Sequence, residues 1–365
     1  MSSESERSGR IQTLDGWRAI AIIVVLCTHI RWPLPQLAFL GYGGDLGVQL
    51  FFALSGFLIT SRLLDEYDAK GVVSWRSFYI RRAFRILPPA FFYLSVLVLL
   101  GYVLHYIPIG AKQLTASVFF FRNYISVASG WYTGHFWSLA VEEHFYLMWP
   151  AVLCFVGIAR GWRAALALAG IFILWRHADK HFNWVGQVVP HLHGSPHRTD
   201  YRIGGLLLGC ALAYLWRSQA GRAILTKRVR SWWSLPLIAA TIALVRHPTR
   251  WSDDGLDLFM ALLPVVTIAD PRGIVSRLLE TRLLSWIGRL SYSLYLWQEL
   301  FLPYYDEPKS FVQKLPFNVA AAFLAALLSY HFIERPFIAY GRRLVRAGGP
   351  PSRASVRIPP ALSPQ

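Results

Sequence analysis

Two residues that could carry acid–base chemistry stand within one apolar run, LDGWRAIAIIVVLCTHI, which holds Arg18 and His29. Eleven helical steps of about 100° return these side chains to nearly the same face, about 16 Å apart along the helix axis. A histidine titrates near neutrality and can act as a general base or acid. His29 is therefore a candidate catalytic group. The alternative is that His29 only hydrogen-bonds a neighbouring helix while Arg18 extends to the membrane surface.

A pair of carboxylates lies in a second apolar run, WSLAVEEHFYLMWP. Ser138, Glu142 and Tyr146 share one helix face at i, i+4 spacing, and Glu143 points about 100° away. Carboxylates are costly in hydrocarbon, so we expect one of the two to face a polar cavity and the other a partner or the membrane interface. A structural ion pair between helices is the alternative.

A basic cluster precedes another apolar run in SFYIRRAFRILPP, where Arg81, Arg82 and Arg85 stand together. Arg82 and Arg85 are i, i+3 neighbours and could bind one phosphate together. The alternative is that the cluster only sets membrane topology. We expect Asp200 and Arg202 to form a structural salt bridge, and further polar groups occur in apolar surroundings at Arg289, Glu299 and Glu334.

The elements that must position these groups are membrane helices. The chain has 365 residues, 55% of them hydrophobic and only 16% charged, whereas soluble domains carry about a quarter charged residues. Apolar stretches of about 20 residues alternate with short polar segments. The sequence predicts an all-α polytopic transmembrane helical bundle of about ten spans, centred near Val24, Gly56, Leu97, Leu147, Ile171, Leu208, Ala239, Leu263, Leu294 and Leu327.

The formal net charge of +17 follows from the basic segments between these runs. Placing the N-terminus in the cytoplasm puts most basic residues inside, including those of segments 76–85, 217–230 and 342–357, as the positive-inside rule requires. Nucleic-acid binding is therefore not indicated. We predict a multi-pass protein of the inner or plasma membrane with both termini cytoplasmic, a cytoplasmic segment 1–13 and a disordered cytoplasmic tail 348–365.

Two other kinds of site are weakly indicated. Five histidines fall between His177 and His197, but no carboxylate or cysteine set completes a metal site, so we expect no metal. Ser55 lies in LSGF and lacks the GxSxG pattern of a serine hydrolase. The glycines of GYGGDLGVQLFFALSGFLIT suit close helix packing or a broken helix that lines a cavity.

The chain carries a series of motifs, in the same order along the sequence, by which it resembles the acyltransferase-3 family of integral membrane O-acyltransferases. Members of this family modify sugars of bacterial envelopes and some secreted metabolites. The resemblance rests on seven blocks: LDGWRAIAIIVVLCTH, GVQLFFALSGFLI, RRAFRILP, FWSLAVEEHFYLMWP, YRIGGLLLGCALA, IGRLSYSLYLW and FIERP. It covers nearly the whole hydrophobic region and implies a transmembrane acyltransferase domain over residues 14–347.

The resemblance implies transfer of an acyl group, usually acetyl, from cytoplasmic acyl-CoA to a hydroxyl acceptor on the outer side, such as a sugar. The family's arginine–histidine signature falls on Arg18 and His29, and its glutamate falls on Glu142. The family's arginine-x-x-arginine element falls on Arg82 and Arg85. Two positions depart from the family pattern: Gln298 replaces a frequent histidine, and Gln49 replaces a frequent aspartate.

We therefore expect Arg82 and Arg85, with Arg18 or Arg81 nearby, to bind the phosphates of the acyl-CoA donor. His29 is the expected general base, and Glu142 is expected to orient the imidazole or to stabilise its charged form. Direct transfer and an acyl-histidine intermediate both remain open. Two other functions also remain open: a transporter or flippase for a lipid-linked or glycosylated substrate, and a non-catalytic membrane scaffold.

Overall fold

The computed structural model describes residues 11–30, 43–125, 130–192, 195–302 and 310–347. The predicted tail 348–365 and the first ten residues lie outside these ranges. Within them the chain is helical and forms no strand. The longer helices are α1 (Gln12–His29), α2 (Gly44–Lys70), α3 (Trp75–Val98), α5 (Phe136–Val156), α6 (Gly161–Phe182), α8 (Thr199–Arg217), α10 (Ser234–Arg246), α11 (Ser252–Ala269), α13 (Arg282–Phe301), α14 (Phe317–Ser329) and α15 (Arg335–Ala347).

Shorter elements connect them. They are α4 (Ala111–Val118), α7 (Trp184–Val188), α9 (Gln219–Arg228) and α12 (Ile274–Leu279), together with 3-10 turns that include η4 (Trp131–Thr133). A π-helical segment, η9 (Tyr330–Glu334), joins α14 to α15, and another, η2 (Leu99–Val103), extends α3.

The predicted all-α multi-pass membrane architecture is confirmed, whereas the predicted number of about ten spans is not. Each predicted span centre lies in a helix of the described chain. Five segments are long and apolar enough to cross a membrane: Gly44–Lys70, Trp75–Val103, Trp131–Val156, Ile158–Phe182 and Phe317–Ala347. The helix α10 is shorter, and α1, α8, α11 and α13 do not reach the same combination of length and apolarity.

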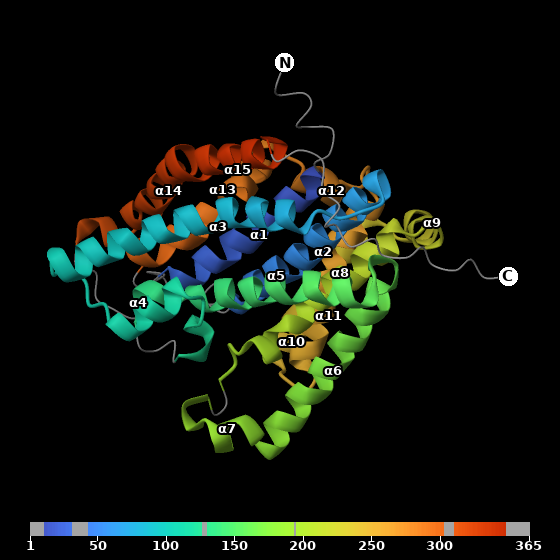
Figure 1. Ribbon diagram of the computed structural model, residues 1–365, viewed down its shortest axis with the longest axis horizontal. Helices are drawn as coiled ribbons and strands as arrows, with labels where there is room; N and C mark the ends of the chain where they lie inside the picture. Colours follow the sequence, from blue (N-terminus) through green and yellow to red (C-terminus); the bar gives the residue numbers. More distant parts are fainter. Residues whose placement is uncertain (1–10, 31–42, 126–129, 193–194, 303–309, 348–365) are drawn as a thin grey trace.

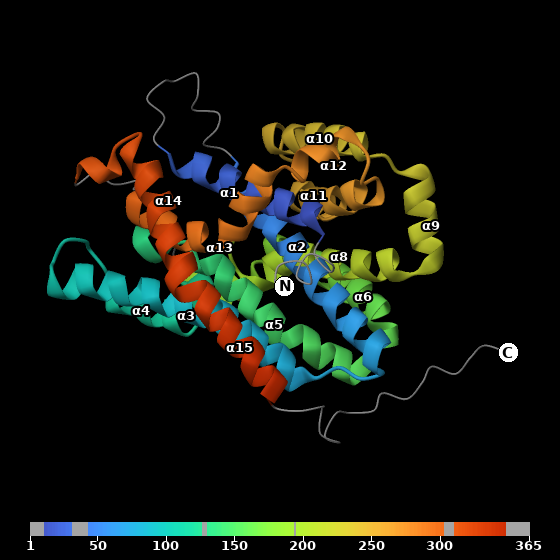
Figure 2. The ribbon, with the colours of Figure 1, turned by 90° about the horizontal axis from the view of Figure 1, so that it is seen from above.

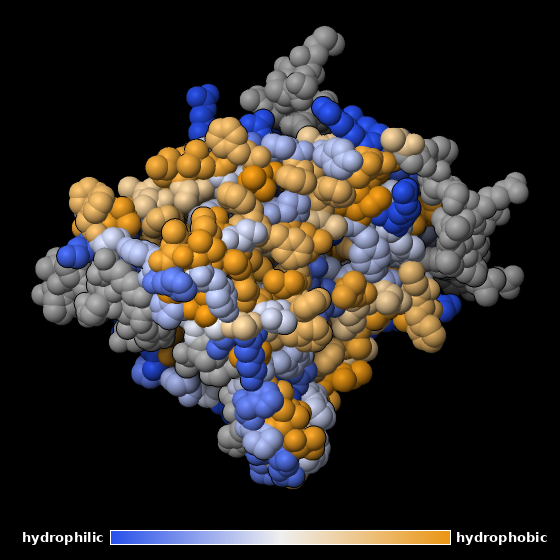
Figure 3. Space-filling view, turned by 60° about the vertical axis from the view of Figure 1, so that its left-hand side comes forward, coloured by the Kyte–Doolittle hydropathy of each residue, from blue (hydrophilic) through white to orange (hydrophobic). Residues whose placement is uncertain are grey.

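The outer surface carries the apolar side chains that a bilayer would cover. Phe155 is 92% exposed and Leu174 is 71% exposed. In Figure 3 hydrophobic residues spread over much of the visible face, and hydrophilic side chains gather mainly at its upper edge and toward its lower tip. Such exposure is unusual for a soluble monomer, where contiguous apolar patches stay small.

Helix α2 packs closely against α8 through small residues. A Cβ atom at Gly56 would lie 1.9 Å from the carbonyl oxygen of Leu206, and one at Gly209 would lie 2.2 Å from that of Ala53. Only glycine permits this approach of two backbones. The prediction of close helix packing is confirmed here, and α2 runs without a break from Gly44 to Lys70.

Helix α1 lies at the centre of the bundle between α2 and α13 (Figures 1 and 2). A Cβ atom at Gly288 of α13 would lie 2.0 Å from the carbonyl oxygen of Asp15, so these two helices also touch backbone to backbone. Helix α3 runs beside α15, where Phe84 contacts Phe337 and Tyr340. This arrangement makes α1, α2, α3, α5 and α13 the walls of the candidate site.

Candidate active site

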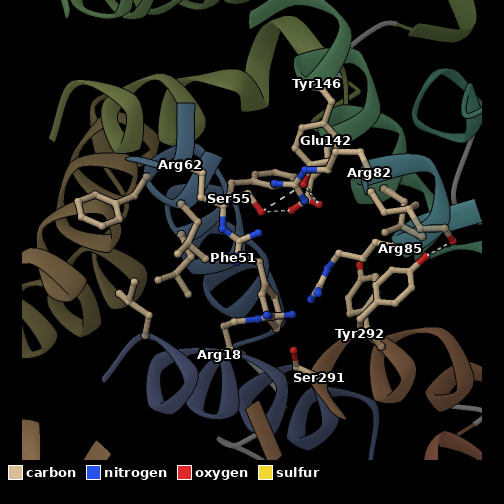
Figure 4. Close-up of a pocket in the computed structure, with 18 of the residues that line it drawn as sticks. Arg18, Phe51, Ser55, Arg62, Arg82, Arg85, Glu142, Tyr146, Ser291 and Tyr292 are labelled. Carbon is tan, nitrogen blue, oxygen red and sulfur yellow. Dashed lines mark hydrogen bonds between the residues drawn. The ribbon is translucent and has the colours of Figure 1, made fainter. Parts of the chain in front are cut away.

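A cavity of about 440 Å³ opens between α1, α2, α3, α5, α13 and α15. Arg18, Arg82 and Arg85, which the sequence proposes as phosphate ligands, all line it (Figure 4). Arg81 does not line it: its Nη2 atom lies 3.1 Å from Glu66 in an exposed ion pair. The structure therefore brings together three of the four proposed arginines.

Two further arginines line the cavity, Arg62 from α2 and Arg342 from α15. Sequence reasoning treated both only as topology signals. In Figure 4 the guanidinium groups of Arg18, Arg62 and Arg85 point toward one another across the open space. Those of Arg82, Arg85 and Arg18 each repel that of Arg62 electrostatically. The spacing Ser55–Arg62, two helical turns on one face, was an available signal.

Both Glu142 and Glu143 line the same cavity. Glu142 accepts hydrogen bonds from Ser55 Oγ at 2.8 Å and Tyr146 Oη at 2.6 Å. The guanidinium of Arg82 lies over the Tyr146 ring, 4.4 Å from its centroid. Ser138 and Tyr146 line the cavity with Glu142, as expected for one helix face, but Glu143 also lines it, so the expectation that only one of the two glutamates would face the cavity is wrong. An ion-pair partner for Glu142 is not seen among the described side chains.

The inner end of the cavity is a polar wall. Ser138 Oγ and Tyr295 Oη lie 2.6 Å apart and share a hydrogen bond, and both lie 3.2 Å from the carbonyl oxygen of His135, which accepts from whichever hydroxyl does not donate to the other. Phe51 meets the Tyr295 ring edge to face at 6.3 Å. Helix α13 runs on past this wall, and one turn beyond Tyr295 it carries Gln298.

His29 lies beyond the wall and is not among the residues lining the cavity. Its Nδ1 atom lies 2.7 Å from Gln298 Oε1, and its ring meets Trp131 edge to face at 5.1 Å. An amide oxygen only accepts hydrogen bonds, so Nδ1 carries the proton and Nε2 keeps its lone pair. This tautomer is the one a general base requires at Nε2. The hydrogen bonds of the described residues link His29 to Gln298 and give Glu142 other partners, so the predicted pairing of His29 with Glu142 stays a prediction.

A second histidine stands next to the wall and was not identified from the sequence. His135 Nδ1 lies 2.5 Å from Glu299 Oε2, and the backbone N–H of His135 donates to the same oxygen at 3.2 Å. His135 is 2% exposed and Glu299 is 3% exposed. The sequence singled out Glu299 only as a polar group in an apolar run. Its partner could not be found without the packing of α5 against α13.

A separate polar network joins α6, α8 and α11. The predicted salt bridge between Asp200 and Arg202 is wrong, because Arg202 Nη2 pairs with Asp45 at 2.8 Å and Asp200 pairs with Arg198. Adjacent residues on one helix point about 100° apart, and two positions about 200° apart, so Asp200 and Arg202 face different neighbours.

The histidines between 177 and 197 take part in separate contacts. His177 pairs with Asp254 at 2.7 Å, and His197 lies 4.4 Å from the ring of Trp137. Burial and the nearby guanidinium of Arg202 lower the pKa of His197 to about 4, which keeps this imidazole neutral at physiological pH. Among the described residues, no three potential ligands gather around a common point that could hold a metal ion, and His193 lies outside them.

Comparison with known proteins adds to this geometry. Residues 11–333 match the sequence profile of the acyltransferase domain, acyltransferase-3. The chain is 29% identical over 365 residues to the peptidoglycan O-acetyltransferase OatA of Listeria monocytogenes, a match that covers 89% of this chain and 55% of that protein. No solved structure matches the chain.

Other relatives are similar at the same level. A protein of Staphylococcus aureus strain COL, provisionally named an O-acetyltransferase, is 30% identical over 90% of this chain and 57% of its own length. A protein of Bacillus subtilis strain 168, provisionally named a peptidoglycan O-acetyltransferase, is 29% identical over 94% of this chain and 57% of its own length. The chain thus spans little more than half the length of the curated relatives that it matches.

Proposed function

The chain belongs to the acyltransferase-3 family, and from this premise we propose that it is a membrane O-acetyltransferase that moves an acetyl group from acetyl-CoA to a hydroxyl of peptidoglycan. The observation that carries the proposal is a cavity lined by five arginines whose inner wall stands one helical turn from the residue that holds His29. The transporter alternative loses its support because the matched family is one of acyltransferases.

The donor site is the arginine-lined cavity. Coenzyme A carries a 3′-phosphate and a pyrophosphate, and guanidinium groups bind phosphate oxygens in a planar, bidentate geometry. The mutual repulsion around Arg62 is relieved when a polyanion enters. Arg18, Arg82 and Arg85 bind the phosphates together with Arg62 and Arg342, whereas Arg81 stays paired with Glu66.

The acetyl thioester reacts at the histidine end. An extended pantetheine arm is comparable to the Arg18–His29 separation, on the order of 15–20 Å along the helix. With its phosphates among the arginines, the donor extends along α13 past Tyr295 toward Gln298 and His29. On this proposal, Ser138 and Tyr295, which line the cavity 2.6 Å apart, separate to admit the arm.

The chemistry needs one base that also returns the proton. His29 Nε2 removes the proton of the acceptor hydroxyl as the oxygen attacks the thioester carbonyl carbon. The tetrahedral intermediate collapses, the carbon–sulfur bond breaks, and the imidazolium protonates the departing thiolate. The products are the acetyl ester and free CoA, and His29 regains its neutral form. General-base catalysis of this kind contributes about 10²–10⁴ in rate.

Membrane orientation follows from charge. The arginine-lined mouth faces the cytoplasm, where positive residues concentrate and where acetyl-CoA is made, and His29 faces the outer half of the membrane. The names of two relatives, both peptidoglycan O-acetyltransferases by name, support peptidoglycan as the proposed acceptor. The match covers 55% and 57% of those two proteins, and only the transfer step is proposed for this chain.

The proposal is tested with the purified chain in proteoliposomes. Acetyl-CoA and solubilised peptidoglycan fragments are supplied, CoA release is followed with a thiol reagent, and the fragments are examined by mass spectrometry for acetyl esters. The proposal predicts acceptor-dependent CoA release and O-acetylated fragments. Export of fragments without any consumption of acetyl-CoA would contradict it and favour a transporter.

A further inference from the structure

Among the described carboxylates, the one that acts electrostatically on His29 is Glu299 and not Glu142. Glu299 follows Gln298 directly on α13, and the carbonyl oxygen of Glu299 accepts a 2.8 Å hydrogen bond from Trp131 Nε1. Trp131 in turn contacts the His29 ring edge to face. Glu299 is therefore the chain neighbour of Gln298, which is hydrogen-bonded to His29. Its backbone is also hydrogen-bonded to Trp131, whose ring packs against that of His29.

The Glu299 carboxylate is held at the N-terminal end of α5. Its Oε2 atom accepts from the backbone N–H and from Nδ1 of His135. A helix N-terminus favours negative charge. Gly134 lies against the carboxylate, since a Cβ atom there would lie 3.3 Å from Oε1 and 3.4 Å from Oε2. These hydrogen bonds hold the Glu299 carboxyl group in one position, although Glu299 is only 3% exposed.

Buried Arg122 is the nearby cation. Its Nε donates to Thr133 Oγ1 at 3.2 Å, and its Nη atoms donate to backbone carbonyls of Ile125 and Gly130. Burial lowers the pKa of Arg122, and the attraction of Glu299 opposes that fall. Arg122 lies outside the membrane helices in the turn before η4 and fixes the loop that carries Trp131.

We infer that Glu299 is the positioning residue that stabilises the charged form of His29 during transfer, the role that the sequence assigned to Glu142. The inference rests on the proposed function. When His29 takes the acceptor proton, a positive charge appears inside the protein, and a fixed negative charge near it is worth more there than in water. Gln298 supplies no charge, so it holds the Nδ1 tautomer while Glu299 supplies the compensating charge.

The arrangement also explains why this chain works with glutamine at position 298. Gln298 Oε1 accepts from His29 but cannot change its own protonation state. A charge-bearing group is needed next to it, and Glu299 occupies the adjacent position. His135 completes the unit by holding the carboxylate, with Nε2 of its own ring lacking a hydrogen-bond partner among the described residues.

Exchange of the two neighbours tests this inference. CoA release from acetyl-CoA is measured with peptidoglycan fragments for the wild-type chain, for Glu299→Gln, and for Gln298→Glu combined with Glu299→Gln. We expect Glu299→Gln to lower kcat on the order of 100-fold with the KM for acetyl-CoA unchanged. The exchange variant places a carboxylate directly on His29 Nδ1 and should return kcat to within tenfold of wild type. A residue that only supports the fold would not be rescued by moving its charge.

Glu334→Gln is the matched control. Glu334 is another buried carboxylate that bonds α13, through Ser293 Oγ at 2.9 Å, and it lines no part of the cavity. The kcat of the Glu334→Gln variant should stay within threefold of wild type.

Unchanged kcat in Glu299→Gln, or an exchange variant whose kcat is below a tenth of wild type, would overturn the inference. If Glu299→Gln does not accumulate in membranes, the exchange variant decides by the same threshold. A wild-type chain that releases no CoA overturns the proposed function as well, and an active wild type with an unaffected Glu299→Gln overturns this inference alone.

Discussion

The two ends of α1 meet opposite electrostatic surroundings. At Arg18, guanidinium groups from four helices crowd one cavity and repel one another, and the carboxylate Glu142 is held there by two hydroxyl groups. At His29, the described polar groups include the Gln298 amide, which is hydrogen-bonded to the ring, and the Glu299 carboxylate, which is held by His135 and acts on the ring electrostatically. The first end is organised for a polyanion, and the second end is organised for one proton. On the proposed function, the length of this helix separates the donor-binding site from the reacting groups.

Loss of the base should have the largest effect. We expect His29→Gln to lower kcat by about 10²–10⁴-fold and to leave the KM for acetyl-CoA unchanged, because the phosphates bind at the other end of α1. The measurement is steady-state CoA release in proteoliposomes. His331→Gln is the control, since that histidine is exposed and bonds only its own helix backbone. A raised KM with unchanged kcat in His29→Gln would mean that His29 contributes to donor binding and not to catalysis, and it would contradict the difference between the two ends of α1.

Loss of Arg82 and Arg85, the proposed phosphate ligands, should raise KM and leave kcat nearly unchanged. We expect Arg82→Ala combined with Arg85→Ala to raise the KM for acetyl-CoA on the order of 10–100-fold, with kcat nearly constant and the effect smaller at high salt. Arg81→Ala should change KM by less than threefold, because Arg81 pairs with Glu66 outside the cavity. Equal effects of Arg81→Ala and Arg82→Ala would favour a diffuse basic surface over a defined cavity.

Loss of the hydrogen bond that fixes the His29 tautomer should have the smallest effect on activity of the three changes. Gln298→Leu removes the acceptor for His29 Nδ1–H, and we expect kcat to fall about tenfold. Gln298→His restores a hydrogen-bond acceptor and should keep kcat within threefold of wild type. The comparison is sharpened if neither variant changes the KM for acetyl-CoA. A Gln298→Leu variant with wild-type kcat would show that the hydrogen bond does not orient His29.

The sequence predicted the donor end better than the catalytic end. Arg18, Arg82 and Arg85 meet because helical periodicity and the point of membrane entry fix where such side chains lie. Arg62 was missed because it was counted only as a topology signal, although it lies inside α2, eight residues before the helix ends. At the catalytic end the partner of His29 lies 269 residues away in the chain, and no local pattern encodes which residue of α13 faces α1.

The same reason explains the remaining error. The pairing of Asp200 with Arg202 was assumed from proximity in sequence, but packing gives Arg202 the carboxylate of Asp45 on α2 instead. Gln298 is the opposite case, because here a feature of the sequence pointed to a contact that the structure contains. It stood out as a departure from the family pattern, and in the structure it is hydrogen-bonded to His29, the predicted base, a contact that periodicity could not specify.

The most direct test of the separation uses two donors. Acetyl-CoA carries the phosphates that the arginines bind, whereas the acetyl thioester of N-acetylcysteamine presents the same reacting group without them. Both donors are assayed with wild type, with Arg82→Ala combined with Arg85→Ala, and with His29→Gln. We predict that the arginine variant loses efficiency only with acetyl-CoA and that His29→Gln loses it with both donors. Equal loss with both donors in the arginine variant would contradict the account.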